Sequence, residues 1–358
     1  MCALVWGGVQ GECRAQVYYN FTQADLTIGG TTYDSYALDN TYASITSNTT
    51  SSGSPLTMLF TTKEGGIGNL SDAIANSTGS GAFTRMFDIS QPGNEPDQRG
   101  YNSAIGTNPN NASDNNPQPR FNQGNGGVQD PIVTPDIATV INVGGVLYYE
   151  FMLDGGESDG RSAISIDELI FFKSDGVNIN TAIGSSGNND DPTPRGVYDL
   201  FKAQDANVEL IYSLDEFGLT GNGTTTTDRT LLVNLIEAGN GDPDFAIYVP
   251  VSAFITDSND PGRYTDRIYL WVEMGSTGQL LTSSPQWGSN QTVSFDSSST
   301  FEEWAFYKGG TPYSAVVPEA EVYVMGLILL GLAGFFEWRR RRSRSVAEDA
   351  SSAPALTV

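Results

Sequence analysis

Residues 146–153 read VLYYEFML, and both alternating sets of positions are apolar except for Glu150. A strand that is covered on both faces, as inside a β-sandwich, has this composition. A second such run, residues 164–172, follows an acidic turn, and shorter β-type runs occur at residues 208–212, 231–236, 245–249, 268–272 and 301–307. No long segment with a 3.6-residue apolar period precedes the C-terminal region. The pattern therefore predicts an all-β protein, built as a single β-sandwich or jelly-roll-like domain.

The rest of the body is rich in turn residues. Residues 17–22 and 24–28 have β-type composition, whereas residues 44–54 are almost all small and polar and predict a flexible loop. Residues 102–127 carry many asparagines among prolines and glycines, and we expect a loose loop without secondary structure there. No repeat of fixed period is visible, which argues against a propeller or solenoid. We expect one β-rich domain over residues 17–309.

The charge and the missing residue types exclude whole classes of function. The 358 residues include 18 Lys and Arg and 42 Asp and Glu, and the formal net charge is -24. So acidic a surface repels nucleic acid phosphates and anionic lipids. The chain has no histidine, and its two cysteines are Cys2 and Cys13. The body therefore lacks the groups for a Ser-His-Asp triad, a usual catalytic zinc site or a cysteine nucleophile, and we predict that it is not an enzyme.

The C-terminal region has the charge pattern of a membrane anchor. Residues 322–336 are uncharged and span about 22 Å as a helix, so residues 320–338 make a marginal span of the ~30 Å hydrocarbon core. Four arginines follow, which the positive-inside rule keeps cytoplasmic, whereas a buried core helix does not need them. We predict a linker at residues 310–321, a transmembrane helix at 322–338 and a basic cytoplasmic tail at 339–358. The residues that define the anchor are Val322, Leu327, Leu330 and Phe336, followed by Arg339, Arg340, Arg341 and Arg342.

Pro318 and Glu319, the apolar run and the arginine cluster follow one another in the order of a PEP-CTERM sorting signal, which this region resembles. The resemblance implies an exosortase, a membrane cysteine transpeptidase, as a partner that cuts near the motif Pro318, Glu319 and Ala320. It also implies export, anchoring in the inner membrane before processing, and then display on the cell surface or in an exopolysaccharide matrix. Two features depart from the family, since Ala320 replaces a proline and residues 343–358 extend beyond the arginines. Both count against efficient processing, and neither affects the predicted membrane anchor.

Short motifs between residues 83 and 307 resemble a bacterial surface domain that commonly precedes PEP-CTERM anchors and has no established activity. They are residues 99–102 (RGYN), 149–154 (YEFMLD), 164–169 (ISIDEL), 239–250 (GNGDPDFAIYVP) and 301–304 (FEEW). This resemblance implies a single domain over residues 17–309. Residues 1–16 fit either the remnant of a secretory signal peptide or an ordinary N-terminal segment. An external domain requires an export signal, which favours the remnant.

Three acidic loops are candidate calcium sites, because closely spaced carboxylates in glycine-rich turns supply the oxygen ligands that calcium prefers. The strongest candidate holds Asp154, Glu157 and Asp159, directly after the strand at residues 146–153, with Asp167 and Glu168 nearby in sequence. The other two loops hold Asp242 with Asp244, and Asp257, Asn259 and Asp260 ahead of Asp266. None has EF-hand spacing, and the same residues also suit ordinary turns. Calcium would be structural, and no other cofactor is predicted.

Two further patterns concern carbohydrate. Trp271, Trp287 and Tyr269 could stack on sugar rings or pack in the core. Glu302 and Glu303 could form the carboxylate pair of a glycosidase, but neighbouring strand residues point to opposite faces. The leading hypothesis is a non-enzymatic surface or matrix protein. An extracellular carbohydrate-binding module, with or without calcium, is the alternative, and its partner would be exopolysaccharide; a hydrolase that uses carboxylates alone comes third.

Overall fold

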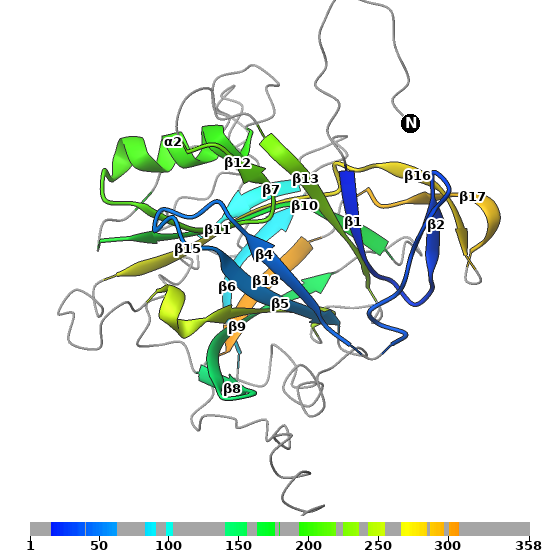
Figure 1. Ribbon diagram of the computed structural model, residues 1–358, viewed down its shortest axis with the longest axis horizontal. Helices are drawn as coiled ribbons and strands as arrows, with labels where there is room; N and C mark the ends of the chain where they lie inside the picture. The colour runs from blue at the N-terminus through cyan, green and yellow to red at the C-terminus, as the bar shows by residue number, and fades with distance from the viewer. Residues whose placement is uncertain are drawn as a thin grey trace, which may run out of the picture. The chain divides into compact units, whose positions relative to one another are not determined.

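The computed structural model (Figure 1) describes residues 16–39, 41–62, 83–90, 98–102, 140–155, 163–175, 179, 193–219, 225–235, 243–254, 266–284, 287–296 and 301–307. Of the described residues, 63% lie in strands and 9% are helical, which confirms the prediction of an all-β protein. The chain divides into two compact units, Met1–Ala315 and Val316–Val358, and every described residue belongs to the first.

The described strands form two seven-stranded sheets and one four-stranded sheet. Sheet I has the order β1-β13-β10-β15-β7, with β11 beside β10 and β12 beside β13. Its strands are β1 (Gln16–Phe21), β7 (Gln98–Tyr101), β10 (Ala163–Ser174), β11 (Glu209–Ser213), β12 (Glu216–Phe217), β13 (Thr225–Asn234) and β15 (Arg267–Met274). Within this sheet β1 pairs with β13 in parallel, and the other pairs are antiparallel.

Sheet II has the order β4-β5-β14-β9-β18-β6, with β8 beside β9. Its strands are β4 (Ala43–Ser47), β5 (Leu56–Thr62), β6 (Phe83–Ser90), β8 (Val140–Val143), β9 (Val146–Gly155), β14 (Phe245–Pro250) and β18 (Phe301–Tyr307). The last strand, β18, lies inside this sheet and pairs with both β6 and β9. A short 3-10 helix, η2 (Val251–Ala253), follows β14.

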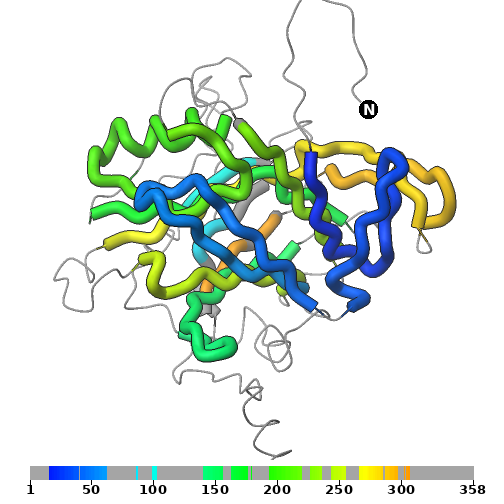
Figure 2. Tube along the Cα trace, in the orientation of Figure 1, coloured from blue at the N-terminus to red at the C-terminus, as the bar shows by residue number. Residues whose placement is uncertain are grey.

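Sheet III joins the two ends of the described chain. It has the order β17-β16-β2-β3 and consists of β2 (Leu26–Ile28), β3 (Thr31–Tyr33), β16 (Gln279–Ser284) and β17 (Gly288–Ser294). Figure 2 shows the early strands in blue beside the late strands in yellow and orange, where β2 pairs with β16.

Sheets I and II pack face to face on one apolar core. β9 contributes Tyr149, Phe151 and Leu153, and β10 contributes Leu169 and Phe171. The Phe151 and Phe171 rings lie 4.9 Å apart at an interplanar angle of 58°, so they connect the two sheets directly. Two sheets that bury alternate residues against each other form a β-sandwich, in which the inner faces exclude water and drive folding.

One segment differs from the loop predicted at residues 44–54. Its first part forms β4, the edge strand of sheet II, in which Ala43 and Ile45 are buried and alternate with exposed residues. The hydroxyls of Thr46 and Thr57 are hydrogen-bonded across the β4–β5 pair at 2.7 Å. Two apolar positions at a period of two are enough to hold an edge strand on the core, although the composition is that of a loop.

The helix α2 (Pro194–Gln204) was not predicted. It begins after Thr193, whose hydroxyl accepts a hydrogen bond from the Gly196 N–H at 3.2 Å, and Pro194 occupies its first turn, where its missing N–H costs nothing. Val197, Tyr198 and Phe201 are buried on one face. α2 packs with this face on the outer side of sheet I, where its side chains share an apolar cluster with β10 and β15 (Figure 1).

Candidate functional site

Most residues with a predicted role lie outside the described part of the chain. They are the sorting motif Pro318, Glu319 and Ala320, the anchor and arginine cluster over residues 322–342, and the candidate calcium ligands Glu157, Asp159, Asp242, Asp257, Asn259 and Asp260. Among the helices that the structure describes, none is long and apolar enough to cross a membrane. Within the same described ranges, no three acidic, histidine or cysteine side chains are grouped so that they could hold a metal ion.

The described acidic residues from the calcium candidates belong to the folded framework. Asp154 lies on β9 opposite Glu303 of β18 and is 2% exposed. Asp244 is fully buried, and its Oδ2 accepts a hydrogen bond from the Gly155 N–H at 3.0 Å, which ties β14 to β9. Asp266 forms an ion pair with Lys173. The calcium site at Asp154, Glu157 and Asp159 stays a prediction.

The sugar-stacking hypothesis is wrong for two of its three aromatics. Trp271 is 0% exposed and Tyr269 is 1% exposed, because both lie on β15 beneath α2. The Tyr269 hydroxyl accepts a hydrogen bond from the Ile179 N–H at 2.9 Å. Trp287 is half-buried, and its ring meets Phe295 edge to face at 6.2 Å. Glu302 is buried as well, so this end of β18 presents no open carboxylate pair.

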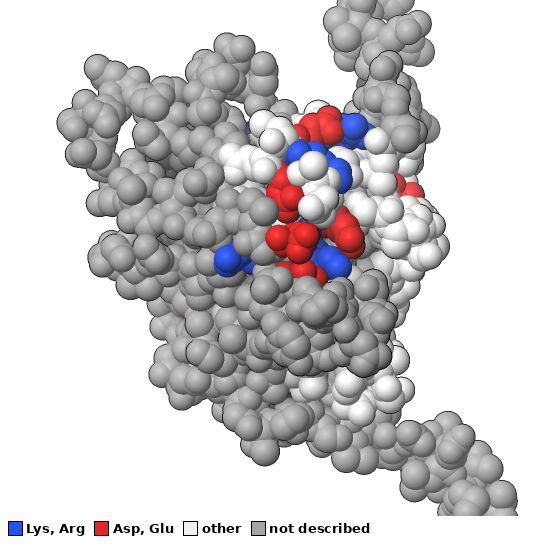
Figure 3. All heavy atoms as spheres, turned by 90° about the vertical axis from the view of Figure 1, so that its left-hand side faces the viewer, with Lys and Arg blue, Asp and Glu red and all other residues white. Residues whose placement is uncertain are grey.

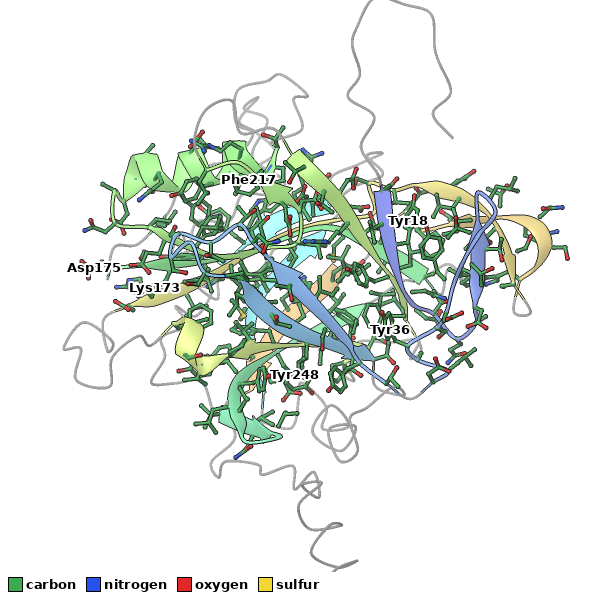
Figure 4. The ribbon with its side chains drawn as sticks, in the orientation of Figure 1. Tyr18, Tyr36, Lys173, Asp175, Phe217 and Tyr248 are labelled. Atoms are coloured by element: carbon green, nitrogen blue, oxygen red, sulfur yellow. The ribbon has the colours of Figure 1, made fainter. Side chains whose placement is uncertain are left out.

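A polar cleft of about 670 Å³ opens at the end of sheet I, beside α2. Its walls come from β10, β11, α2, the segment before β15 and the loop after β4, and its principal lining residues are Lys173, Asp175, Tyr198, Lys202, Glu209 and Asp266. Figure 4 shows Lys173 and Asp175 together at this end of the sheet, and Figure 3 looks onto the same side, where basic and acidic side chains are interspersed.

Lys173 is the fixed cation of this cleft. It is largely buried, and its ammonium lies 3.4 Å from Glu209 Oε2 and 3.5 Å from Asp266 Oδ2. Glu209 stands directly opposite Lys173 in the β10–β11 pairing, so the strand register itself brings the two charges together. A buried ammonium needs such compensation, because its transfer from water is costly. Lys173 therefore holds Glu209 and Asp266 in place.

The remaining lining offers hydrogen-bonding groups rather than an apolar surface. Lys202 donates to the Ala206 carbonyl at 2.6 Å near the end of α2, and its ammonium lies 6.0 Å from the centre of the Tyr198 ring. Asp175 is exposed, and its N–H is held by Asp205 Oδ2 at 3.3 Å. Because the principal lining carries three acidic and two basic side chains, it repels a polyanion and suits an uncharged, hydroxyl-rich ligand.

A second group of polar residues lies on the outer face of sheet I, further along β10. Glu168 of β10 stands opposite Glu273 of β15, and Glu273 stands opposite Arg99 of β7. The Arg99 guanidinium lies 3.2 Å from the Glu273 carboxylate. Asp215, in the turn between β11 and β12, follows Leu214, whose N–H donates to the Leu169 carbonyl at 2.8 Å, and the negative charge of Asp215 raises the pKa of Glu168. We call Glu168, Asp215 and Glu273 the carboxyl cluster.

The carboxyl cluster sits where β10 changes partner. β10 pairs with β13 at residues 163–166 and with β11 at residues 170–173, and a β-bulge lies between Ile166 and Glu168. The extra residue is Asp167. Its carboxylate accepts hydrogen bonds from the Ser165 hydroxyl at 2.7 Å and from the N–H of Ser276, in the turn after β15, at 2.8 Å. The bulge thus turns Glu168 onto the outer face beside Asp215.

Burial perturbs the ionisation of this cluster. It raises the pKa of Asp215 to about 7, against lowering contributions from the Arg229 N–H and guanidinium. Burial also raises the pKa of Glu168 well above its usual value, and the negative charges of Asp215 and Glu273 raise it further. Both shifts have the same origin, because a carboxylate removed from water and placed beside other carboxylates is disfavoured relative to the neutral acid.

Sequence reasoning named Glu168 and Asp266 only beside candidate calcium loops, and it identified neither group as a whole. The cleft combines Lys173, Glu209 and Asp266 from three separate segments, and only the strand register brings them together. Glu168 had a visible signal, a carboxylate within the apolar run at residues 164–172, but its partner Asp215 comes from a turn much later in the chain.

The chain matches no protein-family model, no curated protein and no solved structure.

Proposed function

We propose that this chain is an exported, non-enzymatic surface protein whose β-sandwich is displayed by a C-terminal PEP-CTERM-like anchor. The observation that carries the proposal is the order of the C-terminal sequence: Pro318 and Glu319, the uncharged run at residues 322–336, and then the arginine cluster at residues 339–342. A short apolar helix followed by arginines stops translocation with the basic end in the cytoplasm, which leaves the large body outside.

The acidic composition of the domain at residues 17–309 is compatible with a location outside the membrane. The net charge of -24 keeps it soluble and away from anionic lipid headgroups. In this proposal an exosortase-type membrane transpeptidase is the processing partner near Pro318 and Glu319. The protein is held in the inner membrane before processing and then reaches the cell surface or the exopolysaccharide matrix.

Removal of the anchor is expected to change the location of the protein. Deleting residues 322–342 should move an exported chain from the membrane fraction to the soluble extracytoplasmic fraction, because the apolar run is then missing. Fractionation of cells expressing each form, followed by mass spectrometry of the mature C-terminus, measures both location and processing. A variant with lysines in place of Arg339, Arg340, Arg341 and Arg342 keeps the charge and should remain membrane-bound. A full-length chain that is soluble and uncut in the cytoplasm would contradict the proposal.

A second candidate function, carbohydrate binding, is favoured by the cleft beside α2. Its volume of about 670 Å³ lies within the range of small-ligand sites. Asp175 and Glu209 are acceptors at its rim, and Glu209 is kept in position by Lys173. Carboxylates that are fixed in this way can accept hydrogen bonds from the hydroxyls of an uncharged glycan.

The cleft variant with the clearest expected effect is Asp175→Asn. It should weaken binding of the chain to an uncharged glucan by about tenfold, because a hydrogen bond to a charged acceptor contributes roughly 1.5–3 kcal/mol. Affinity electrophoresis in glucan-containing gels provides the measurement, and a polyuronate gel tests the expected repulsion of polyanions. Asp199→Asn is the matched control, since Asp199 is exposed on α2, pairs with Arg195 and does not line the cleft. Equal retardation of both variants and the unaltered chain would exclude this site.

A further inference from the structure

We infer that β17 is a docking edge for a second copy of this chain, and that two copies pair their β17 strands antiparallel across a two-fold axis. Within the described part of the chain, β17 is the end strand of sheet III and pairs only with β16. The side chains of residues 288–292 are exposed, and Figure 1 shows β17 at the outer margin of the described strands. The inference rests neither on the C-terminal anchor nor on the cleft.

The open side of β17 presents backbone donors and acceptors in a regular order. The Phe295 N–H donates to the Gly278 carbonyl at 2.8 Å, which fixes the phase of the β16–β17 ladder. Hydrogen-bonded and non-hydrogen-bonded pairs alternate along an antiparallel ladder, so Thr292 and Ser294 both belong to non-hydrogen-bonded pairs. Their N–H and C=O groups therefore point away from β16. Pairing of Thr292 in one copy with Ser294 in the other, and the reverse, satisfies all of these groups.

The charge of the chain favours this edge for contact between identical copies. No residue of β2, β3, β16 or β17 is charged, although the whole chain carries a net charge of -24. Repulsion between two such acidic chains opposes association through their charged surfaces, whereas two uncharged sheets can approach closely. β17 also lacks the charged residues and prolines that commonly protect a free edge from pairing.

Other end strands of the three sheets are less suited to such pairing. β6 carries Arg85 and Asp88, and β7 carries Arg99, so two copies would bring like charges together at either edge. At the opposite end of sheet III, Asn20 of β1 donates to the Tyr33 carbonyl of β3 at 2.9 Å, so that edge is already occupied within the chain. β17 therefore combines an open backbone with an uncharged surrounding.

The side chains and the backbone of β17 also set the size of the contact. In the inferred register Thr292 faces Ser294 of the other copy, and cross-strand pairs of hydroxyl side chains favour strand association. Asn290 has a φ of 53° and lies at a bulge, where its N–H donates to Ser283 Oγ at 2.9 Å, so regular pairing ends there. The contact is therefore short, and its two-fold symmetry closes it as a weak dimer instead of an open fibre.

The test is sedimentation equilibrium of the full chain in density-matched detergent over a wide range of protein concentration. The unaltered chain should show a reversible monomer–dimer equilibrium that shifts towards dimer with added NaCl, because salt screens the repulsion between the acidic copies. Thr292→Pro removes an outward N–H from each copy and leaves the bonds to β16 intact. It should raise the dimer dissociation constant at least about tenfold. Leu281→Lys is the matched control, since Leu281 is 61% exposed on β16 opposite Thr292 but lies one strand away from the edge, and it should leave the constant nearly unchanged.

A chain that stays monomeric at every concentration would overturn the inference, and so would a dimer that is equally stable in Thr292→Pro. Dissociation caused by Leu281→Lys and not by Thr292→Pro would also overturn it, because the copies would then meet through the outer face of sheet III.

Disulfide capture decides the matter if Thr292→Pro does not fold. The starting chain has serine in place of Cys2 and Cys13. Adding Thr292→Cys and Ser294→Cys should give disulfide-linked dimers under mild oxidation, because the Cα atoms of directly opposite residues lie about 5.5 Å apart, within reach of a disulfide. Thr27→Cys in the same starting chain, on β2 inside sheet III, should give far fewer. Equal yields of dimer from the two chains would exclude pairing at β17.

Discussion

Replacing Phe151 with alanine is expected to lower the free energy of unfolding by about 3–5 kcal/mol. Phe151 is 0% exposed and lies at the centre of the sandwich core. Its strand neighbours are Ile247 on β14 and Phe306 on β18, and its ring meets Phe171 of the opposite sheet at 4.9 Å. Three strands and a facing sheet surround the side chain, so the cavity left by its removal cannot close by a small local shift. Since ordinary domains are stable by about 5–15 kcal/mol, the variant loses a large share of its stability.

The control for Phe151→Ala lies on the same strand. Leu147→Ala also shortens a large apolar side chain of β9, but Leu147 is 46% exposed, so the expected loss is below about 1 kcal/mol. Urea unfolding of the full chain, followed by tryptophan fluorescence, gives both values. Equal losses for the two variants would show that sheets I and II do not share the core at Phe151.

Replacing Glu150 with glutamine is expected to stabilise the protein by about 3 kcal/mol at pH 8 and to leave its stability nearly unchanged near pH 4.5. Glu150 lies on the outer face of β9 and is buried, and burial raises its pKa to about 7. Tyr248 on β14 donates a hydrogen bond to Glu150 Oε1 at 2.8 Å and partly offsets this shift. A carboxyl whose pKa is raised by folding stabilises the fold below its unfolded pKa, and this contribution is lost as pH rises to about 7 and beyond. Glutamine has the same shape and does not titrate.

Tyr248→Phe provides the complementary change. It removes the donor that favours ionised Glu150, so the pKa of Glu150 should rise and the pH range over which stability is lost should extend upwards. Unfolding free energies measured at half-unit steps from pH 4.5 to pH 9 compare the three proteins. A pH dependence that is the same in the unaltered chain and in Glu150→Gln would show that Glu150 does not ionise in this range.

The central strands could be predicted because they are covered on both faces and therefore apolar throughout. This holds for β9, β10, β14 and β15, whose burial patterns are almost continuous. Edge strand β4 was missed because it has only two buried apolar residues, and the serines and threonines around them give the segment the composition of a loop. Helix α2 was missed because eleven residues with a narrow buried face give a weak 3.6-residue period, although Thr193 followed by Pro194 is a helix-start signal.

Neither the cleft nor the carboxyl cluster could be predicted in the same way. A sequence shows which residues carry charge, but Lys173 meets Glu209 and Asp266 only through the pairing of strands that are distant in the chain. The electrostatic interaction of Glu168 with Asp215 depends further on a bulge in β10, a feature that carries no composition signal. The acidic segments at the end of β9 and before β14 were proposed as calcium sites because their carboxylates are close in sequence. In the structure, the described Asp244 instead accepts a hydrogen bond from the Gly155 N–H.

The position of β18 inside sheet II limits the order in which the protein can fold. β6 and β9 have β18 as their common neighbour, yet residues 301–307 are the last part of the sandwich to leave the ribosome. β1 likewise pairs with β13, which is made some two hundred residues later, as the register of Tyr19 with Leu231 shows. Contacts between such distant segments form slowly, because the intervening chain must first give up its freedom. The sandwich of a nascent chain can therefore be completed only when nearly all of that chain has been made.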